Sequence, residues 1–126
     1  MFKITDTFQQ SLFEVYGEKE NSCERFMALT KKYKEYFHME EPEYFTSPGR
    51  MELIGNHTDH NGGKVLAASI QMDTIAAAGP NRTETVTILS EGYEQPFMLN
   101  LEKLETIPGD EGTLSLLAGI FQGCRA

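Results

Sequence analysis

A stretch of seventeen residues, SPGRMELIGNHTDHNGG at 47–63, constrains the fold of this chain more than any other feature. It holds four glycines, one arginine, two histidines and one aspartate, and it has almost no core-forming pattern. Glycine adopts positive φ without steric cost, so Gly55, Gly62 and Gly63 predict a polar loop that is carried on a strand and held at both ends. The core-forming segments are therefore expected on either side of it.

The residues before this stretch have helical periodicity. Asp6 is a suitable N-cap and Gly17 a suitable stop for a helix over residues 7–16. Pro42 ends a second helix over about 22–38, and the sequence EYFTS after it predicts extended backbone. Apolar residues at helical spacing give this second helix one core-facing stripe, formed by Phe26, Leu29, Tyr33 and Phe37.

The residues after this stretch are predicted to be mainly strands. The sequence at 64–79 fits a buried strand with a second strand behind it, although its alanines leave a helix open. Alternating segments at 83–92 and 96–102 predict a hairpin, and a final helix is predicted over 113–126. Because strands cluster rather than alternate with helices, the fold class is α+β, with a mixed or antiparallel sheet and packed helices.

Composition excludes several classes of function. The chain has 126 residues, a length that suits one domain, and a formal net charge of −8. Binding to nucleic acid or an anionic membrane requires clustered lysine and arginine, so neither partner is expected. No apolar run is long enough to span a bilayer. Cys23 and Cys124 lack metal-ligand spacing, and no secretory signal pattern is present, which together favour reduced thiols and a cytoplasmic location.

The polar stretch suggests a site for a small polyhydroxyl ligand. Asp59 can accept two sugar hydroxyls, while histidine and asparagine side chains can donate or accept hydrogen bonds. Arg50 presents a planar fork of donors suited to phosphate or carboxylate, and a turn predicted at Pro48-Gly49 would set its position. Three alternatives stay open from the residues alone: an arginine paired with a surface glutamate, a hydrogen-bonded turn without a ligand, and a metal site built from His57, Asp59 and His60.

The sequence at 49–63 closely resembles the first signature of galactokinases, within the GHMP small-molecule kinases. The resemblance covers most of the chain and is strong from about 46 to 72. It implies that residues 1–126 form an incomplete GHMP-kinase N-terminal domain, of the ribosomal protein S5 domain 2-like fold. Eleven of the fifteen signature positions are identical without a gap: Gly49, Arg50, Leu53, Ile54, Gly55, His57, Thr58, Asp59, Asn61, Gly62 and Gly63.

This resemblance implies transfer of the γ-phosphoryl group of ATP to the anomeric hydroxyl of galactose or a related sugar. Arg50 matches a position near the transferring phosphate, where a guanidinium stabilises the charge of the transition state. Asn56, His57 and Asp59 match positions that hold the sugar. Asn56 stands where the family has a glutamate, and Glu52 stands where it has an asparagine. A neutral amide is a weaker acceptor than a carboxylate, so the identity of the sugar stays open.

The family's Gly- and Ser-rich phosphate loop and the segment with its catalytic aspartate have no match in the chain. The resemblance therefore implies the first third of a galactokinase-like protein, inactive alone because most positioning groups are absent. ATP and Mg²⁺ are implied for the full-length protein, with no cofactor or metal site in this part. Besides a sugar ligand, self-association through exposed surface of the incomplete domain is expected. The alternatives are a non-catalytic sugar sensor acting through a protein partner, and a remnant without a ligand.

Overall fold

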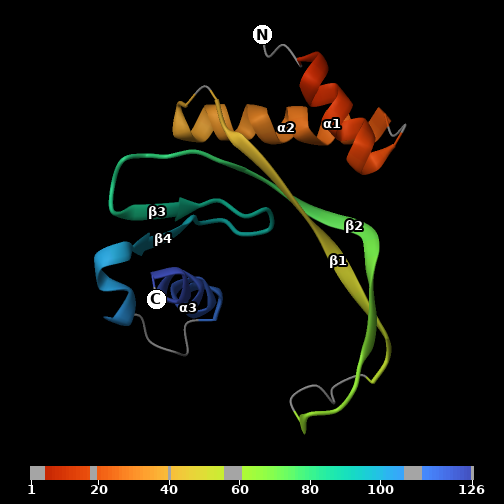
Figure 1. Cartoon of the computed structure of the whole chain (residues 1–126). Coiled ribbons are helices and arrows are strands. Elements are labelled where there is room, and N and C mark those ends of the chain that lie inside the picture. The colour runs from red at the N-terminus through yellow and green to blue at the C-terminus, as the bar shows by residue number, and fades with distance from the viewer. Residues whose placement is uncertain (1–4, 18–19, 40, 56–60, 107–111, 126) are drawn as a thin grey trace. The chain divides into compact units, whose positions relative to one another are not determined.

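The computed structural model describes residues 5–17, 20–39, 41–55, 61–106 and 112–125. Helices come first, antiparallel strand pairs follow, and a helix comes last, so the predicted α+β class is confirmed (Figure 1). The chain divides into two compact units, Met1–Pro80 and Asn81–Ala126. In chain order the elements are α1 (Asp6–Tyr16), α2 (Glu20–Phe37), β1 (Glu43–Ile54), β2 (Leu66–Ala78), β3 (Thr85–Ile88), β4 (Phe97–Asn100), the 3-10 helix η2 (Leu101–Thr106) and α3 (Thr113–Arg125).

Helix α1 has well-defined caps at both ends. The Thr5 hydroxyl accepts a hydrogen bond from the Phe8 backbone N–H at 3.3 Å. At the other end the Gly17 N–H donates to the Phe13 carbonyl at 2.8 Å, as predicted for the stop residue. The prediction of Asp6 as the N-cap is wrong, because Asp6 is the first helical residue. Its carboxylate there still favours the helix, since it lies at the positive end of the helix dipole.

Helix α2 supplies most of the core of the first unit. Phe26 and Tyr33 are buried and the other two stripe residues are half-buried, so the predicted core-facing stripe is confirmed. The Phe26 ring lies 5.6 Å from the Tyr44 ring of β1, in an edge-to-face arrangement. The buried hydroxyl of Thr30 lies 2.6 Å from both the Phe26 carbonyl oxygen and the Tyr44 hydroxyl. These contacts attach β1 to α2.

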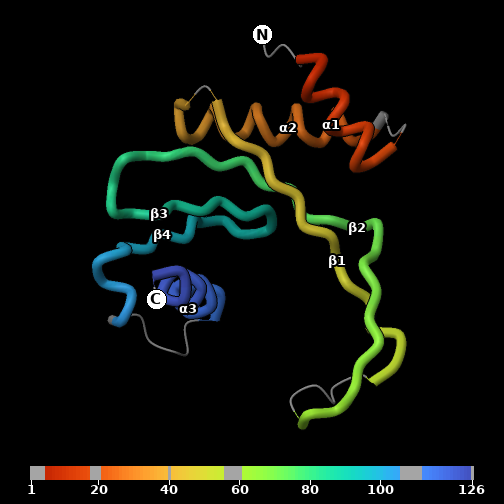
Figure 2. The backbone as a smooth tube through the Cα atoms, in the orientation of Figure 1, coloured from red at the N-terminus to blue at the C-terminus, as the bar shows by residue number. Residues whose placement is uncertain are grey.

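Strands β1 and β2 form an antiparallel two-stranded ribbon that extends well past the two helices (Figures 1 and 2). The predicted pair of buried strands at 64–79 is wrong, because β2 is one strand and most of its residues are exposed. A continuous strand forms because β1 is long enough to pair with it throughout. It stays exposed because a ribbon of only two strands cannot cover its own faces.

The predicted turn at Pro48-Gly49 is also wrong, because both residues lie inside β1. The register changes there: Pro48 pairs with Asp73, whereas Gly49 pairs with Ile70. Two residues of β2 are therefore extra, which makes this irregularity a β-bulge. The bulge bends the ribbon where the sequence indicated a reversal of the chain.

The second unit is a small hairpin packed with helices. Strands β3 and β4 pair antiparallel, with Thr85 opposite Asn100 and Ile88 opposite Phe97, which confirms the predicted hairpin. Helix α3 confirms the predicted final helix. The predicted extension of the second strand to residue 102 is wrong, because η2 begins at Leu101. The Asn100 side chain accepts a hydrogen bond from the Glu102 N–H at 2.8 Å, which starts that turn. The core of this unit consists of Leu99, Leu104 and Ala118.

Candidate functional site

Glycines bring together the two ends of the segment between the ribbon strands. Gly55 follows β1 with φ of 92°, and Gly62 has φ of 74°. A Cβ atom on Gly55 would overlap the Lys64 carbonyl oxygen and would lie 2.9 Å from the Val65 Cα atom. A side chain at Gly55 is therefore excluded, and the chain leaves β1 and returns to β2 at one place. The positive φ predicted for the glycines is confirmed at Gly55 and Gly62, and the close contact that holds the end of the segment is present at Gly55.

The predicted sugar contacts Asn56, His57 and Asp59 lie outside the described residues, as does His60 of the alternative metal site. Among the residues that are described, no group of three or more His, Cys, Asp or Glu side chains could hold a metal ion. Within the same ranges, no helix is long and apolar enough to cross a membrane. Of the predicted site residues, the structure thus positions the side chain of Arg50.

Arg50 lies on the part of the ribbon beyond the bulge, opposite Ser69 of β2. Its side chain is 72% exposed, and its Nη2 atom lies 3.4 Å from Oε1 of Glu52. An ion pair between Arg50 and a glutamate was one of the alternatives left open by the sequence, and the structure contains it. Because strand residues two apart share a face, Arg50 and Glu52 project from the same side of β1. An exposed ion pair of this length contributes little stability and can exchange for another anion.

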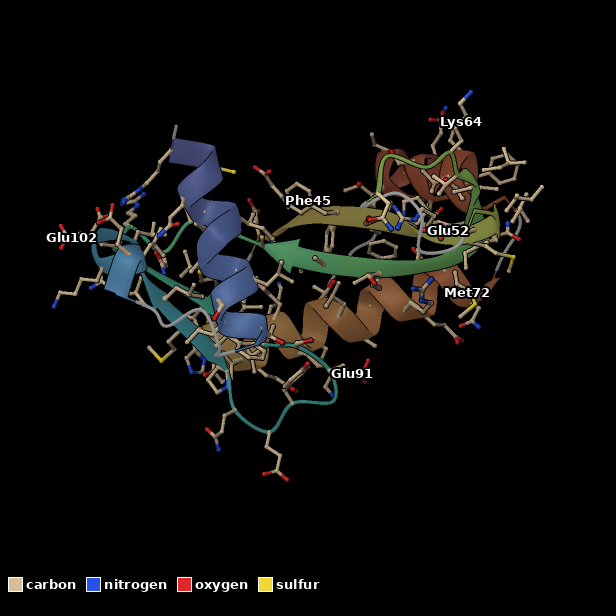
Figure 3. The ribbon with its side chains drawn as sticks, turned by 90° about the horizontal axis from the view of Figure 1, so that it is seen from below. Phe45, Glu52, Lys64, Met72, Glu91 and Glu102 are labelled. Carbon is tan, nitrogen blue, oxygen red and sulfur yellow. The ribbon has the colours of Figure 1, made fainter. Side chains whose placement is uncertain are left out.

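Gly49 permits the bulge that directly precedes Arg50. A Cβ atom on Gly49 would lie 2.9 Å from the Met72 carbonyl oxygen and 3.1 Å from Cγ1 of Ile70. Bulges redirect the side chains that follow them, so the backbone around Gly49 sets the direction of the guanidinium. In Figure 3, Glu52 lies toward the end of the ribbon that carries Lys64, and Phe45 lies toward the other end.

A cluster around the carboxylate of Asp73 joins both helices to the ribbon. Arg25 Nη2 of α2 lies 2.8 Å from Asp73 Oδ1. The hydroxyls of Tyr16 in α1 and Thr46 in β1 both donate to Oδ2, the latter at 2.7 Å. Sequence analysis missed this cluster, whose members are up to 57 positions apart. The available signal was a single charged residue, Asp73, in the mainly apolar segment LAASIQMDTIAAA, since a charge in such a segment is usually paired.

The cluster shifts the pKa values of Asp73 and Tyr16, which share its shortest hydrogen bond. The Asp73 side chain is only 11% exposed. Hydrogen bonding from Tyr16 lowers the pKa of Asp73 to about 2, with help from Thr46 and Arg25 and against the effect of burial. Burial and the hydrogen bond to Asp73 raise the pKa of the Tyr16 hydroxyl. Asp73 therefore stays ionised and Tyr16 neutral at ordinary pH, which is the state that the contacts require.

We expect the first unit to lose stability in acid as Asp73 is protonated. The pKa of Asp73 is about 2 in the folded chain, against 3.8 for an ordinary aspartate. The contribution of the lowered pKa, about 2 kcal/mol, is thus complete above pH 4 and is lost as pH falls through 2. Urea unfolding curves between pH 5 and 2 measure it. In Asp73→Asn, the decrease in the free energy of unfolding between pH 5 and 2 should be smaller by this amount. An unchanged decrease would show that another group causes the loss of stability in acid.

Comparisons with known proteins point to one family. A family model described as the galactokinase galactose-binding signature matches residues 31–80. The galactokinase of Lactococcus lactis subsp. lactis is 40% identical over 88 residues, which is 69% of this chain and 22% of the relative. A Streptococcus thermophilus galactokinase is 42% identical over 73 residues, covering 58% of this chain and 19% of the relative.

A more distant organism gives the same result. The galactokinase of Dictyostelium discoideum is 35% identical over 74 residues, which is 58% of this chain and 15% of the relative. The chain thus spans about a fifth of the length of the curated relatives that it matches. No solved structure gives a significant match. The resemblance to galactokinases is confirmed over the N-terminal portion of this chain, and residues 31–80 carry the galactose-binding signature of that family.

Proposed function

We propose that this chain is the sugar-binding N-terminal part of a galactokinase-like sugar kinase. The observation that carries the proposal is the match of residues 31–80 to the galactose-binding signature, which includes the whole polar stretch. In the full-length protein, the proposed reaction is phosphorylation of the anomeric hydroxyl of galactose or a related sugar by ATP. The fold is proposed to be part of a GHMP-kinase N-terminal domain. The chain alone is expected to be inactive as a kinase.

The sugar is proposed to bind through Asn56, His57 and Asp59. In the sequence these residues follow Gly55, which lies at the end of the ribbon against the returning backbone of Lys64 and Val65. A carboxylate at Asp59 accepts hydrogen bonds from sugar hydroxyls, whereas His57 can donate or accept. Close contact between Gly55 and the Lys64–Val65 backbone sets where this segment leaves and rejoins the ribbon. The supporting frame is thus made by backbone packing rather than by charged side chains.

Arg50 is proposed to stabilise the transferring phosphoryl group. Its guanidinium is exposed, and among the described residues it is held by the long contact with Glu52, so an anion can replace that carboxylate. In the proposed reaction the sugar hydroxyl loses its proton and its oxygen forms a bond to the γ-phosphorus of ATP, while the bond from that phosphorus to ADP breaks. Arg50 offsets the charge on the phosphoryl oxygens. Mg²⁺, when bound in the full-length protein, would neutralise charge on the phosphates of ATP.

Calorimetric titration of this chain with galactose and galactosamine tests the proposal. Asn56→Glu restores a charged acceptor for a sugar hydroxyl, so it should tighten binding by about tenfold. Gln71→Glu is the matched control, because it also changes an amide to a carboxylate but lies on β2. If neither sugar gives a binding heat, the chain has no sugar site at residues 56–59. The same conclusion follows if the two substitutions change the affinity equally.

The free thiols of Cys23 and Cys124 are compatible with a reducing compartment, and a cytoplasmic location stays a prediction. The sensor alternative has no observation in its favour and is not proposed.

A further inference from the structure

The part of the β1-β2 ribbon beyond the bulge has two chemically different faces. Arg50 and Glu52 bond to each other and so lie on the same side. The alternate residues lie on the other side, because neighbouring strand residues point to opposite faces. Alternation along β1 puts Met51 and Leu53 on this other side, and the pairing of Met51 with Ala68 and of Gly49 with Ile70 places the β2 residues at 66, 68 and 70 there as well. We call this set the apolar face: Met51, Leu53, Leu66, Ala68 and Ile70.

The apolar face is open to solvent along most of its length. Leu53, Leu66 and Met51 are 58%, 55% and 52% exposed. Single exposed apolar side chains are ordinary, but a contiguous row on one face of a sheet marks an interaction surface. The helices of this unit bond to the ribbon through Thr46 and Asp73, which lie on the opposite side of the bulge from the apolar face. In Figure 1 both helices of this unit lie at the other end of the ribbon from the apolar face.

The distribution of charge indicates which partner the apolar face accepts. The whole chain has a net charge of −8, which opposes the approach of a second copy over most of the surface. On this part of the ribbon, however, the charged residues of the two strands are Arg50 and Glu52, which pair with each other on the opposite face. Two copies can therefore meet on the apolar face without bringing like charges of the strands together.

We propose that two copies of this chain associate face to face through the apolar face. The same surface then serves both partners, as in other isologous dimers with a two-fold axis. The two ribbons pack as sheets do, with the apolar side chains interleaved between them. Each Arg50 stays on the outer side of the pair, so association leaves the proposed phosphate-facing side accessible. This inference is independent of the proposed function.

Sedimentation velocity of the whole chain over a wide concentration range tests the proposal. The mass should rise from 14.2 kDa toward twice that value, and it should rise more readily in higher salt, because salt screens the repulsion between acidic copies. Leu66→Lys should weaken the association at least tenfold, since it places a charge in the interface of both partners. Ala67→Lys is the matched control: it adds the same charge one residue later, opposite Glu52 on the polar face.

Each other outcome would overturn the proposal. A chain that stays monomeric at the highest concentrations does not use the apolar face for self-association. A dimer that is unaffected by Leu66→Lys, or weakened equally by Ala67→Lys, forms through another surface. Both side chains are exposed, so neither substitution should prevent folding, and circular dichroism confirms this for each variant.

Discussion

Replacing Asp73 with alanine should lower the free energy of unfolding of the first unit by about 2–4 kcal/mol. The change removes the acceptor shared by Tyr16 and Thr46 and leaves the Arg25 guanidinium without its carboxylate. It also removes one of the links between the two helices and the ribbon, since these contacts join all four elements. Against a typical stability of roughly 5–15 kcal/mol for a domain, the loss is large. Urea unfolding followed by circular dichroism measures it.

The control for this experiment is another acidic residue in an ion pair. Glu35 lies 3.8 Å from Lys31 on α2, and both side chains are mostly exposed. Such a pair contributes less than about 0.5 kcal/mol, so Glu35→Gln should leave the unfolding midpoint almost unchanged. Equal effects of the Asp73 and Glu35 substitutions would show that the carboxylate of Asp73 contributes no more than a surface charge.

Replacing Gly55 with alanine should cost about 3 kcal/mol and should abolish sugar binding. The backbone there has positive φ, and the added Cβ would overlap the Lys64 carbonyl oxygen. Alanine therefore forces the two strands apart at the point where the proposed sugar-binding segment begins. Urea unfolding measures the loss of stability, and calorimetry with galactose measures the loss of binding.

Gly62→Ala separates the two causes of the lost stability, which are the positive φ and the overlap of the added Cβ atom. Gly62 also has positive φ, but a Cβ atom there would meet no atom within 4 Å. Its substitution should therefore cost only the backbone strain, about 1 kcal/mol. If both alanine variants lose the same stability, the close contact between Gly55 and the returning strand does not hold the ribbon end together.

Local patterns predicted most of the elements correctly. Helical spacing of Phe26 and Tyr33 identified the buried side of α2, because a helix has a fixed period. Alternation identified the β3-β4 hairpin for the same reason. The errors occurred where a distant segment decides the outcome. Pro48-Gly49 has the composition of a turn, but two extra residues in β2 let β1 continue through it as a bulge.

The candidate site shows the same division. The run from Arg50 to Gly63 could be recognised from sequence because its chemistry is contiguous and its glycines have a local, steric reason. The Asp73 cluster could not be recognised, because its four members come from four elements and meet only after folding. The apolar face was likewise hidden, since exposure depends on what packs against a strand and not on its composition.

The sequence by itself determined the signature residues, the helical stripe and the glycines at the ends of the polar stretch. The stripe follows from periodicity and the glycines from the steric freedom of one residue, whereas the signature residues follow from the resemblance to galactokinases. Only the tertiary structure decided the register of the ribbon, the partners of Asp73 and the contact of Arg50 with Glu52. The register and the partners of Asp73 depend on which distant segments pack together, and the contact of Arg50 with Glu52 depends on β1 continuing as a strand through Pro48-Gly49.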